Sequence, residues 1–259
     1  MTKSRLLSFA ICLTISSMVL AGRCVAAERS DKPASAAPPA WIKPAFEGGR
    51  TEIEFYDPEK QAQEFAGWTI YDFQLHHRFL YEYKVRPVKN TYAVTIVPQF
   101  TEIEMPMRHR IRLPMKFDTP LVWDSSLAKH ELEHVAIGAH PRVRKLTEHM
   151  LKKIQRVQRI VDTPSQLTEE WFEKAISEEI APRRDAIDAL ITANNRQLDL
   201  LTGHGVRRLK DHDAFFSQMY LKENLDEMRF PYLSETLDLL EQFDYQSARW
   251  DLSSVRSDK

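Results

Sequence analysis

The sequence predicts an α+β fold in which a β-rich first half, residues 51–123, precedes a mainly helical second half, residues 124–259. In the first half, apolar and charged residues alternate with the period of two that is typical of strands. After Trp123 the apolar residues recur every three or four positions, which is the period of an amphipathic helix. Because 43% of all residues are hydrophobic, residues 51–259 are expected to fold as a single domain around its own core.

The first 27 residues have the features of an export signal. Lys3 and Arg5 precede an apolar stretch from residue 6 to residue 20, and Val25-Ala26-Ala27 offers the small residues that a signal peptidase reads. We therefore expect the protein to be exported, either to the periplasm or to the outside of the cell. Once the signal is cleaved, no stable membrane span is expected.

Residues 28–50 are expected to form a flexible lead-in, because their prolines, alanines and serines offer little apolar surface. The formal net charge of the whole chain is −1, and removing the three basic residues of the signal makes it −4. This near-neutral balance gives no argument for nucleic acid as a partner.

Strands are expected throughout the first half of the domain. Ile53 and Phe55 alternate with glutamates, residues 92–97 are rich in β-branched side chains, and residues 110–113 alternate arginine with an apolar residue. Residues 68–85 are rich in aromatic side chains and fit strand or short helix equally well.

Helices are expected after Trp123. Residues 124–126 offer side-chain oxygens that can cap a helix running to about Gly138. An apolar stripe from Val143 to Val161 predicts a second helix of about five turns, with mostly basic remaining faces. A further helix is expected from about residue 168, and helix continues over residues 183–201. The Gly-His-Gly of residues 203–205 interrupts it, and another amphipathic run covers about residues 213–240.

The segment His130-Glu131-Leu132-Glu133-His134 contains the H-E-x-x-H pattern of zinc enzymes. On a helix, His130 and His134 are one turn apart on the same face, so both imidazoles can bind one Zn²⁺ ion. Zinc lowers the pKa of a bound water, and Glu131 is placed to accept a proton from it as the general base.

A catalytic zinc needs a third protein ligand, and the sequence leaves three choices open. His140 lies ten residues after His130, the spacing seen in H-E-x-x-H-x-x-G-x-x-H enzymes, although Gly138 is one position late for that pattern. His204 lies between two glycines that allow the backbone to turn sharply. The third choice is a glutamate of a later helix, namely Glu173, Glu178 or Glu179.

Several other polar residues are weaker candidates. Glu133 could orient a ligand, although exposure to solvent is the favoured interpretation. His76, His77 and His109 have no partner at ligand spacing, so structural or surface roles are expected. The candidates for stabilising an oxyanion are Arg207, Arg208 and Tyr220.

Taken together, the segments Leu113-Pro114, Trp123, Leu127 through His134 and Asp199 through Gly205 resemble a poorly characterised bacterial family of secreted zinc-dependent proteases of the zincin group. The resemblance covers roughly residues 50 to 206. It implies a zincin-like fold, with a helix bearing the metal-binding histidines after a β-rich half.

By this resemblance, His130 and His134 are zinc ligands, Glu131 is the base, and His204 is a functional histidine, which favours His204 over His140 as the third ligand. The family pattern often has a tyrosine before its aspartate, whereas this chain has Leu198 there, so no role for that hydroxyl carries over.

The leading functional hypothesis is a secreted or periplasmic zinc metallopeptidase that acts on a peptide or protein substrate. The alternative is a non-catalytic envelope scaffold that binds a partner and holds a structural zinc or none. Metal analysis of the purified protein separates binding of zinc from its absence.

Overall fold

The computed structural model describes residues 9–11, 37–61 and 66–250. Apart from the short strand β1, the expected export signal, residues 1–27, lies outside the described residues. Within the described part of the chain, no helix combines the length and the apolar character needed to cross a membrane.

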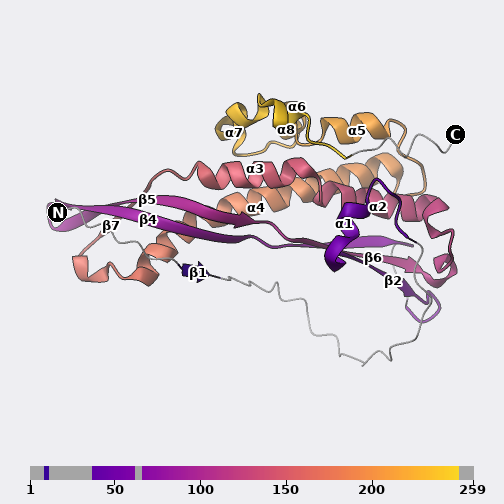
Figure 1. Ribbon diagram of the computed structural model, residues 1–259, viewed down its shortest axis with the longest axis horizontal. Coiled ribbons are helices and arrows are strands. Elements are labelled where there is room, and N and C mark those ends of the chain that lie inside the picture. The colour runs from indigo at the N-terminus through magenta and orange to yellow at the C-terminus, as the bar shows by residue number, and fades with distance from the viewer. Residues whose placement is uncertain (1–8, 12–36, 62–65, 251–259) are drawn as a thin grey trace.

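The described strands form two sheets (Figure 1). The strands are β1 (Phe9–Ile11), β2 (Thr51–Tyr56), β3 (Trp68–Phe73), β4 (His76–Val88), β5 (Thr91–Glu104), β6 (Met107–Pro114) and β7 (Val157–Val161). The first sheet has the order β1-β4-β5-β7 and is antiparallel throughout. The second has the order β2-β6-β3, with β6 parallel to β2 and antiparallel to β3.

Helices follow mainly after β6. They are α1 (Lys43–Phe46), α2 (Ser126–Gly138), α3 (Pro141–Lys152), α4 (Glu169–Thr202), α5 (His212–Gln218), α6 (Lys222–Glu227), α7 (Leu233–Leu240) and α8 (Phe243–Gln246). Short 3-10 turns span residues 47–49, 115–117, 122–124 and 164–166.

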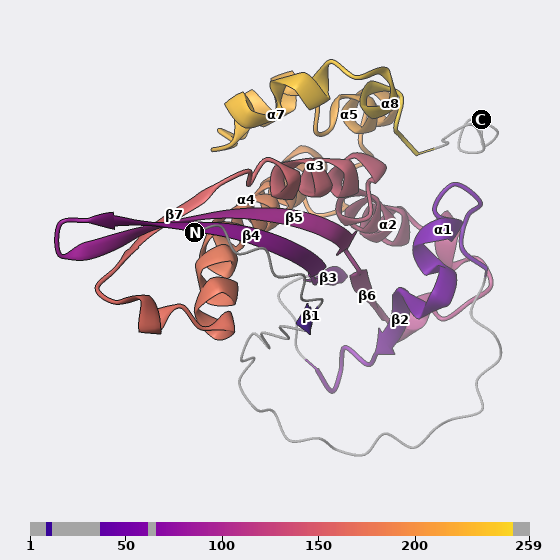
Figure 2. The same cartoon turned by 60° about the vertical axis from the view of Figure 1, so that its left-hand side comes forward.

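The elements are stacked in three layers (Figures 1 and 2). The strands form one side, the helices α2, α3 and α4 cover them, and α5 to α8 form an outer layer over α3. The long hairpin of β4 and β5 extends away from the rest of the molecule together with β7. This arrangement places α2 in the middle of the molecule, between the second sheet and α4.

Two clusters of buried apolar side chains hold these layers together. The larger includes Ile111 and Leu113 of β6, Leu132 of α2 and the second half of α4. The smaller lies under the hairpin, where Val94 and Ile96 of β5 contact Ile176 in the first half of α4. The 34-residue helix α4 therefore contributes to both clusters.

The expected α+β class is confirmed, with the β-rich half first. Residues 68–85, whose sequence fits strand or short helix equally well, form strand β3 and most of β4. Ser125 caps α2 by accepting a hydrogen bond from the backbone N–H of Ala128 at 3.1 Å. The helix ends at Gly138, as expected from the sequence.

The helix expected from Val143 to Val161 is wrong in its second half. Helix α3 ends at Lys152, and residues 157–161 form β7, which pairs with β5 from Ile96 to Tyr92. Alternate residues of β7 are buried, so Val157 and Val161 reach the smaller cluster from a strand. An apolar residue every three or four positions is compatible with either arrangement when the run is short.

The helix expected from about residue 168, continuing to residue 201, is the single helix α4, which contains Pro182. In contrast, residues 213–240 are divided among α5, α6 and α7, because Tyr220 and Arg229 have left-handed backbone conformations that no helix interior adopts.

A flexible lead-in was expected at residues 28–50, but residues 41–46 pack against the rest of the fold. Ile42 and Ala45 are buried in the larger cluster, and Trp41 and Phe46 pack against it. The apolar side chains among residues 41–46 are sufficient to dock this segment, although the prolines around them resemble those of a linker.

One buried cation connects the middle and outer layers. Arg142 at the start of α3 is only 2% exposed, and its guanidinium donates hydrogen bonds to four backbone carbonyl groups. These acceptors belong to Ser217, Met219, Tyr245 and Gln246. The guanidinium thus attaches the ends of α5 and α8 to α3.

We expect Arg142→Leu to lower the free energy of unfolding by about 3 kcal/mol, because it leaves several carbonyl groups without a donor. Arg144→Leu is the matched control, since Arg144 is on the same helix but is exposed and pairs with Glu148 at the surface; it should cost less than about 0.5 kcal/mol. Urea unfolding of both variants measures the difference, and equal losses would contradict a role for the carbonyl contacts.

Candidate metal centre

Helix α2 is buried on nearly all sides, and its C-terminal end is held by other parts of the chain. Its apolar residues Leu132, Val135 and Ile137 are fully buried. Near its C-terminus, the carbonyl group of Ile137 accepts a hydrogen bond from the Tyr220 hydroxyl, and that of Ala136 accepts one from the Trp250 indole. A helix fixed in this way holds its side chains in constant positions.

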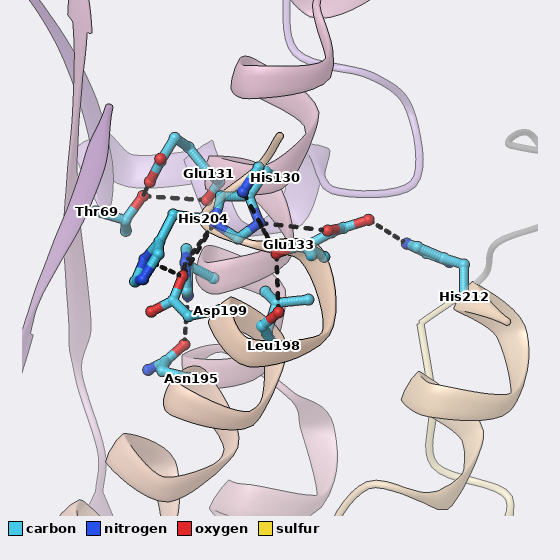
Figure 3. A network of polar contacts seen from close by, with 12 residues as sticks. Thr69, His130, Glu131, Glu133, Asn195, Leu198, Asp199, His204 and His212 are labelled. Carbon is cyan, nitrogen blue, oxygen red and sulfur yellow. Dashed lines mark hydrogen bonds and ion pairs between the residues drawn. The ribbon is translucent and has the colours of Figure 1, made fainter. Parts of the chain in front are cut away.

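The two histidines of α2 meet an aspartate of α4, and Figure 3 shows this aspartate, Asp199, beside His130. The Nε2 atoms of His130 and His134 are 3.1 Å apart, and Asp199 Oδ1 lies 3.1 Å from the first and 3.2 Å from the second. Among the described residues, these three side chains form the group whose ligand atoms are close enough to share one metal ion.

The distances within this group fit a tetrahedral zinc site. Two ligand atoms at about 2.0 Å from one tetrahedral ion are separated by about 3.3 Å. The three observed separations are 3.1, 3.1 and 3.2 Å. Two imidazoles and one carboxylate are also a ligand set that zinc accepts in catalytic sites.

The outer nitrogen atoms of both imidazoles contact α4 as well. His134 Nδ1 lies 2.9 Å from Asn195 Oδ1, and His130 Nδ1 lies 3.3 Å from Thr202 Oγ1. The Thr202 hydroxyl donates to the carbonyl group of Leu198, so it can accept the proton of His130 Nδ1. If a metal ion were bound, both rings would carry their proton on Nδ1, and both Nε2 lone pairs would be directed toward the ion beside the Asp199 carboxylate.

Charges within the group shift its acid–base equilibria. Burial by itself would lower the pKa of His130, but the hydrogen bond with Asp199 and the nearby carboxylates of Glu133 and Glu131 raise it to about 9. Burial would raise the pKa of Asp199, but the hydrogen bonds with His130 and His134 lower it well below its usual range. Asp199 is therefore ionised at neutral pH, as a metal ligand must be.

Glu131 points from α2 toward the edge of the second sheet. Its Oε2 atom accepts a hydrogen bond of 2.8 Å from the Thr69 hydroxyl of β3, which also contacts the Glu131 carbonyl oxygen at 3.1 Å. Burial raises the pKa of Glu131, although His134, His130 and the Thr69 hydrogen bond act in the opposite direction. A carboxylate that is held in place and made more basic is suited to proton transfer.

His204 lies next to the three-residue group rather than within it. Its Nδ1 atom is 3.4 Å from Asp199 Oδ1, and its side chain is half exposed. The backbone is left-handed at Gly203, His204 and Gly205, and a Cβ atom at Gly205 would lie only 3.0 Å from the His130 ring. This turn brings the chain over His130, and glycine is needed where the two come together.

The structure does not bring the other candidate ligands to the site. His140 is buried at the start of α3, where its Nδ1 atom accepts a hydrogen bond from the N–H of Arg142. Glu173, Glu178 and Glu179 are on α4, 20 to 26 residues before Asp199, which corresponds to roughly 30 to 40 Å along a helix.

Two other expectations need correction. Glu133 is not exposed to solvent; it is buried between His130 and His212. Tyr220 is fully buried and donates its hydroxyl proton to the Ile137 carbonyl, so it supports α2 and is not available to an oxyanion. Arg207 and Arg208 are exposed after the Gly-His-Gly turn.

Three histidines, His76, His77 and His109, have the structural or surface positions that were expected. His76 and His77 begin β4, and His109 is buried on β6. Burial lowers the pKa of His109 to about 4, so this side chain is neutral in the folded protein at pH 7.

Sequence reasoning gave no role to several residues that the structure places at the site, among them Asp199 as a ligand, Asn195, Thr202, Thr69 and His212. A signal for three of them was present, because Asn195, Asp199 and Thr202 follow the spacing i, i+4 and i+7 of one helix face. Thr69 and His212 are brought in by tertiary packing, and no local pattern marks them.

Comparison of the chain with models of known protein families, with curated proteins and with solved structures found no match.

The identity of the third ligand can be tested by zinc affinity. We expect Asp199→Ala to weaken zinc binding by more than about 100-fold, because it removes a ligand atom, and His204→Ala to weaken it by less than about 10-fold. Competition with a chromophoric chelator measures both constants. The opposite order would assign the third position to His204.

The burial of His140 predicts an acid-sensitive fold. Burial, with a smaller contribution from the Arg142 charge, lowers the pKa of His140 to about 3. The unfolded chain takes up this proton near pH 6.5, so between these values the unfolded state holds more protons and acidification destabilises the fold. His140→Asn keeps a side chain that can cap α3 and removes the titration.

Between pH 7 and pH 5, His140 should account for about 2 kcal/mol of the stability that the native protein loses. Urea unfolding at both pH values should therefore show a loss in the His140→Asn variant that is smaller by this amount. The same loss in both proteins would contradict a neutral buried imidazole.

Proposed function

We propose that this protein is a zinc-dependent hydrolase, specifically a metallopeptidase with a zincin-like arrangement of its site. The observation that carries the proposal is the convergence of His130, His134 and Asp199, with Glu131 beside them on the same buried helix. The proposed location is the periplasm or the outside of the cell, on the basis of the export signal in the sequence.

In this proposal, His130, His134 and Asp199 would hold the ion. When bound, zinc supplies a Lewis acid that polarises a carbonyl group and lowers the pKa of an adjacent water. Three protein ligands leave a position open for substrate, which distinguishes a catalytic from a closed structural site.

Glu131 acts as the general base. Thr69 holds its Oε2 atom, so the carboxylate is fixed in orientation. Glu131 takes a proton from the attacking water and returns it to the nitrogen of the leaving amine. The raised pKa of Glu131 helps both transfers because it brings the pKa closer to neutrality.

The edge of β3 is the proposed place for the substrate backbone. Within the described residues, β3 pairs with β6 on one side only, and Thr69 connects this strand directly to Glu131. An extended peptide can add to a free strand edge through main-chain hydrogen bonds. A peptide bound there would pass next to the proposed base.

A structural zinc in a non-catalytic scaffold is the competing proposal. The position of His204, 3.4 Å from Asp199, favours it to the extent that this imidazole could occupy a fourth coordination position. A closed site of this kind would bind zinc tightly without hydrolysing peptides.

The decisive variant is Glu131→Gln. It should keep zinc at close to one equivalent and lower peptide hydrolysis by about 100- to 10,000-fold, because the amide cannot accept the proton. Metal analysis and cleavage of a mixed peptide library measure the two properties separately. Glu148→Gln, on the neighbouring helix α3, is the matched control and should change neither.

Hydrolysis that persists in zinc-loaded Glu131→Gln would contradict the mechanism. A wild-type protein that binds zinc but cleaves no peptide would favour the scaffold, and one that binds no zinc would exclude both proposals.

A further inference from the structure

Glu133 is a buried carboxylate that the proposed reaction does not use. It lies on α2 between the two histidines in sequence, and its side chain is only 12% exposed. Its Oε2 atom is 3.9 Å from His130 Nδ1, and its Oε1 atom is 3.5 Å from His212 Nε2 (Figure 3). Among the described residues, these are the two basic side chains within 4 Å of the carboxylate.

His212 is held in place by aromatic rings. It is the first residue of α5, and its imidazole packs against Phe216 at 4.7 Å and against Trp41 at 6.0 Å between ring centres. Burial lowers the pKa of His212, although the charges of Glu133 and Asp213 oppose this effect. The neutral ring can still present an Nε2–H group to Glu133.

A carboxylate this deeply buried is costly unless it faces a donor or a cation. A histidine that binds a metal through Nε2 also needs an acceptor at Nδ1, and a charged acceptor makes the ring a stronger ligand. His130 Nδ1 faces two acceptors, the neutral Thr202 hydroxyl and the Glu133 carboxylate. Zinc binding at His130 makes its Nδ1 proton more acidic and therefore favours the carboxylate.

We propose that Glu133 and His212 are positioning residues for the zinc ligand His130. With zinc bound, the His130 Nδ1 proton would turn from the Thr202 hydroxyl to Glu133 Oε2, now 3.9 Å away, and His212 holds the Glu133 carboxylate in the orientation that this contact requires. The metal centre is thereby connected to α5 in the outer layer and to Trp41 near the start of the described fold. The inference rests on the proposed zinc site.

The test measures zinc affinity by competition with a chromophoric chelator, in variants whose metal-free fold is checked by thermal unfolding. Glu133→Gln should weaken zinc binding by about 10- to 100-fold. His212→Phe should weaken it by a smaller factor of about 3 to 10, whereas His212→Gln, which keeps a donor near the position of Nε2, should stay within about 2-fold of the wild type.

The double variant Glu133→Gln, His212→Phe should bind zinc no more weakly than Glu133→Gln alone, because His212 acts only through Glu133. His149→Phe is the matched control, since His149 makes a similar contact with Asp238 outside the metal centre. It should leave zinc affinity unchanged.

Zinc affinities within 2-fold of the wild type for both Glu133→Gln and His212→Phe would overturn the inference while leaving the zinc site intact. Additive losses, or equal losses in His212→Phe and His212→Gln, would also overturn it, because they indicate a packing role. If Glu133→Gln does not fold, the two His212 variants decide by themselves. Failure of the wild type to bind zinc would instead refute the proposed function.

Discussion

The contact between α2 and α4 is the interaction on which the rest of this molecule depends. Both helices present polar side chains to each other at a point where most of α2 is buried. His130 and His134 on α2 meet Asn195, Asp199 and Thr202 on α4, and every imidazole nitrogen of the pair has a partner on the opposite helix. A shift of α4 by one residue, about 1.5 Å along its axis and a third of a turn around it, would remove these partners. The apolar packing on either side of the site therefore fixes the register of the polar group.

Charge balance is the second constraint on this region. Three carboxylates lie near His130, and all are at least partly buried. Glu131 and Glu133 follow His130 on the same helix, and Asp199 contacts it from α4. Buried anions are stable only when cations or donors face them. The protein distributes this task between two elements: Thr69 of β3 donates to Glu131, and His212 of α5 faces Glu133. Because these partners come from the sheet and from α5, the surroundings of the site extend through all three layers. A bound divalent cation would complete the balance of charge.

Structural features were predicted from the sequence where the interactions join neighbouring residues, and were missed where the partners are far apart in the chain. Features set by neighbouring residues were predicted well, such as an N-cap of α2 among residues 124–126, the end of that helix near Gly138 and the α+β order. The stripe from Val143 to Val161 was misread because Val157 and Val161 are buried by pairing with β5, more than 50 residues earlier in the chain. A helix and a strand can bury the same few apolar residues, and only the distant partner decides between them.

By itself, the sequence determined that two histidines would share a helix face with a glutamate beside them, because the helical period acts over four residues. It also contained the i, i+4, i+7 spacing of Asn195, Asp199 and Thr202, although nothing local indicates what that face meets. Only the tertiary structure decided that Asp199 completes the group, that His140 caps a helix, and that Glu133 is buried against His212. The physical reason is that a metal site is assembled from residues far apart in the chain, and the packing of helices and sheet determines which of them meet.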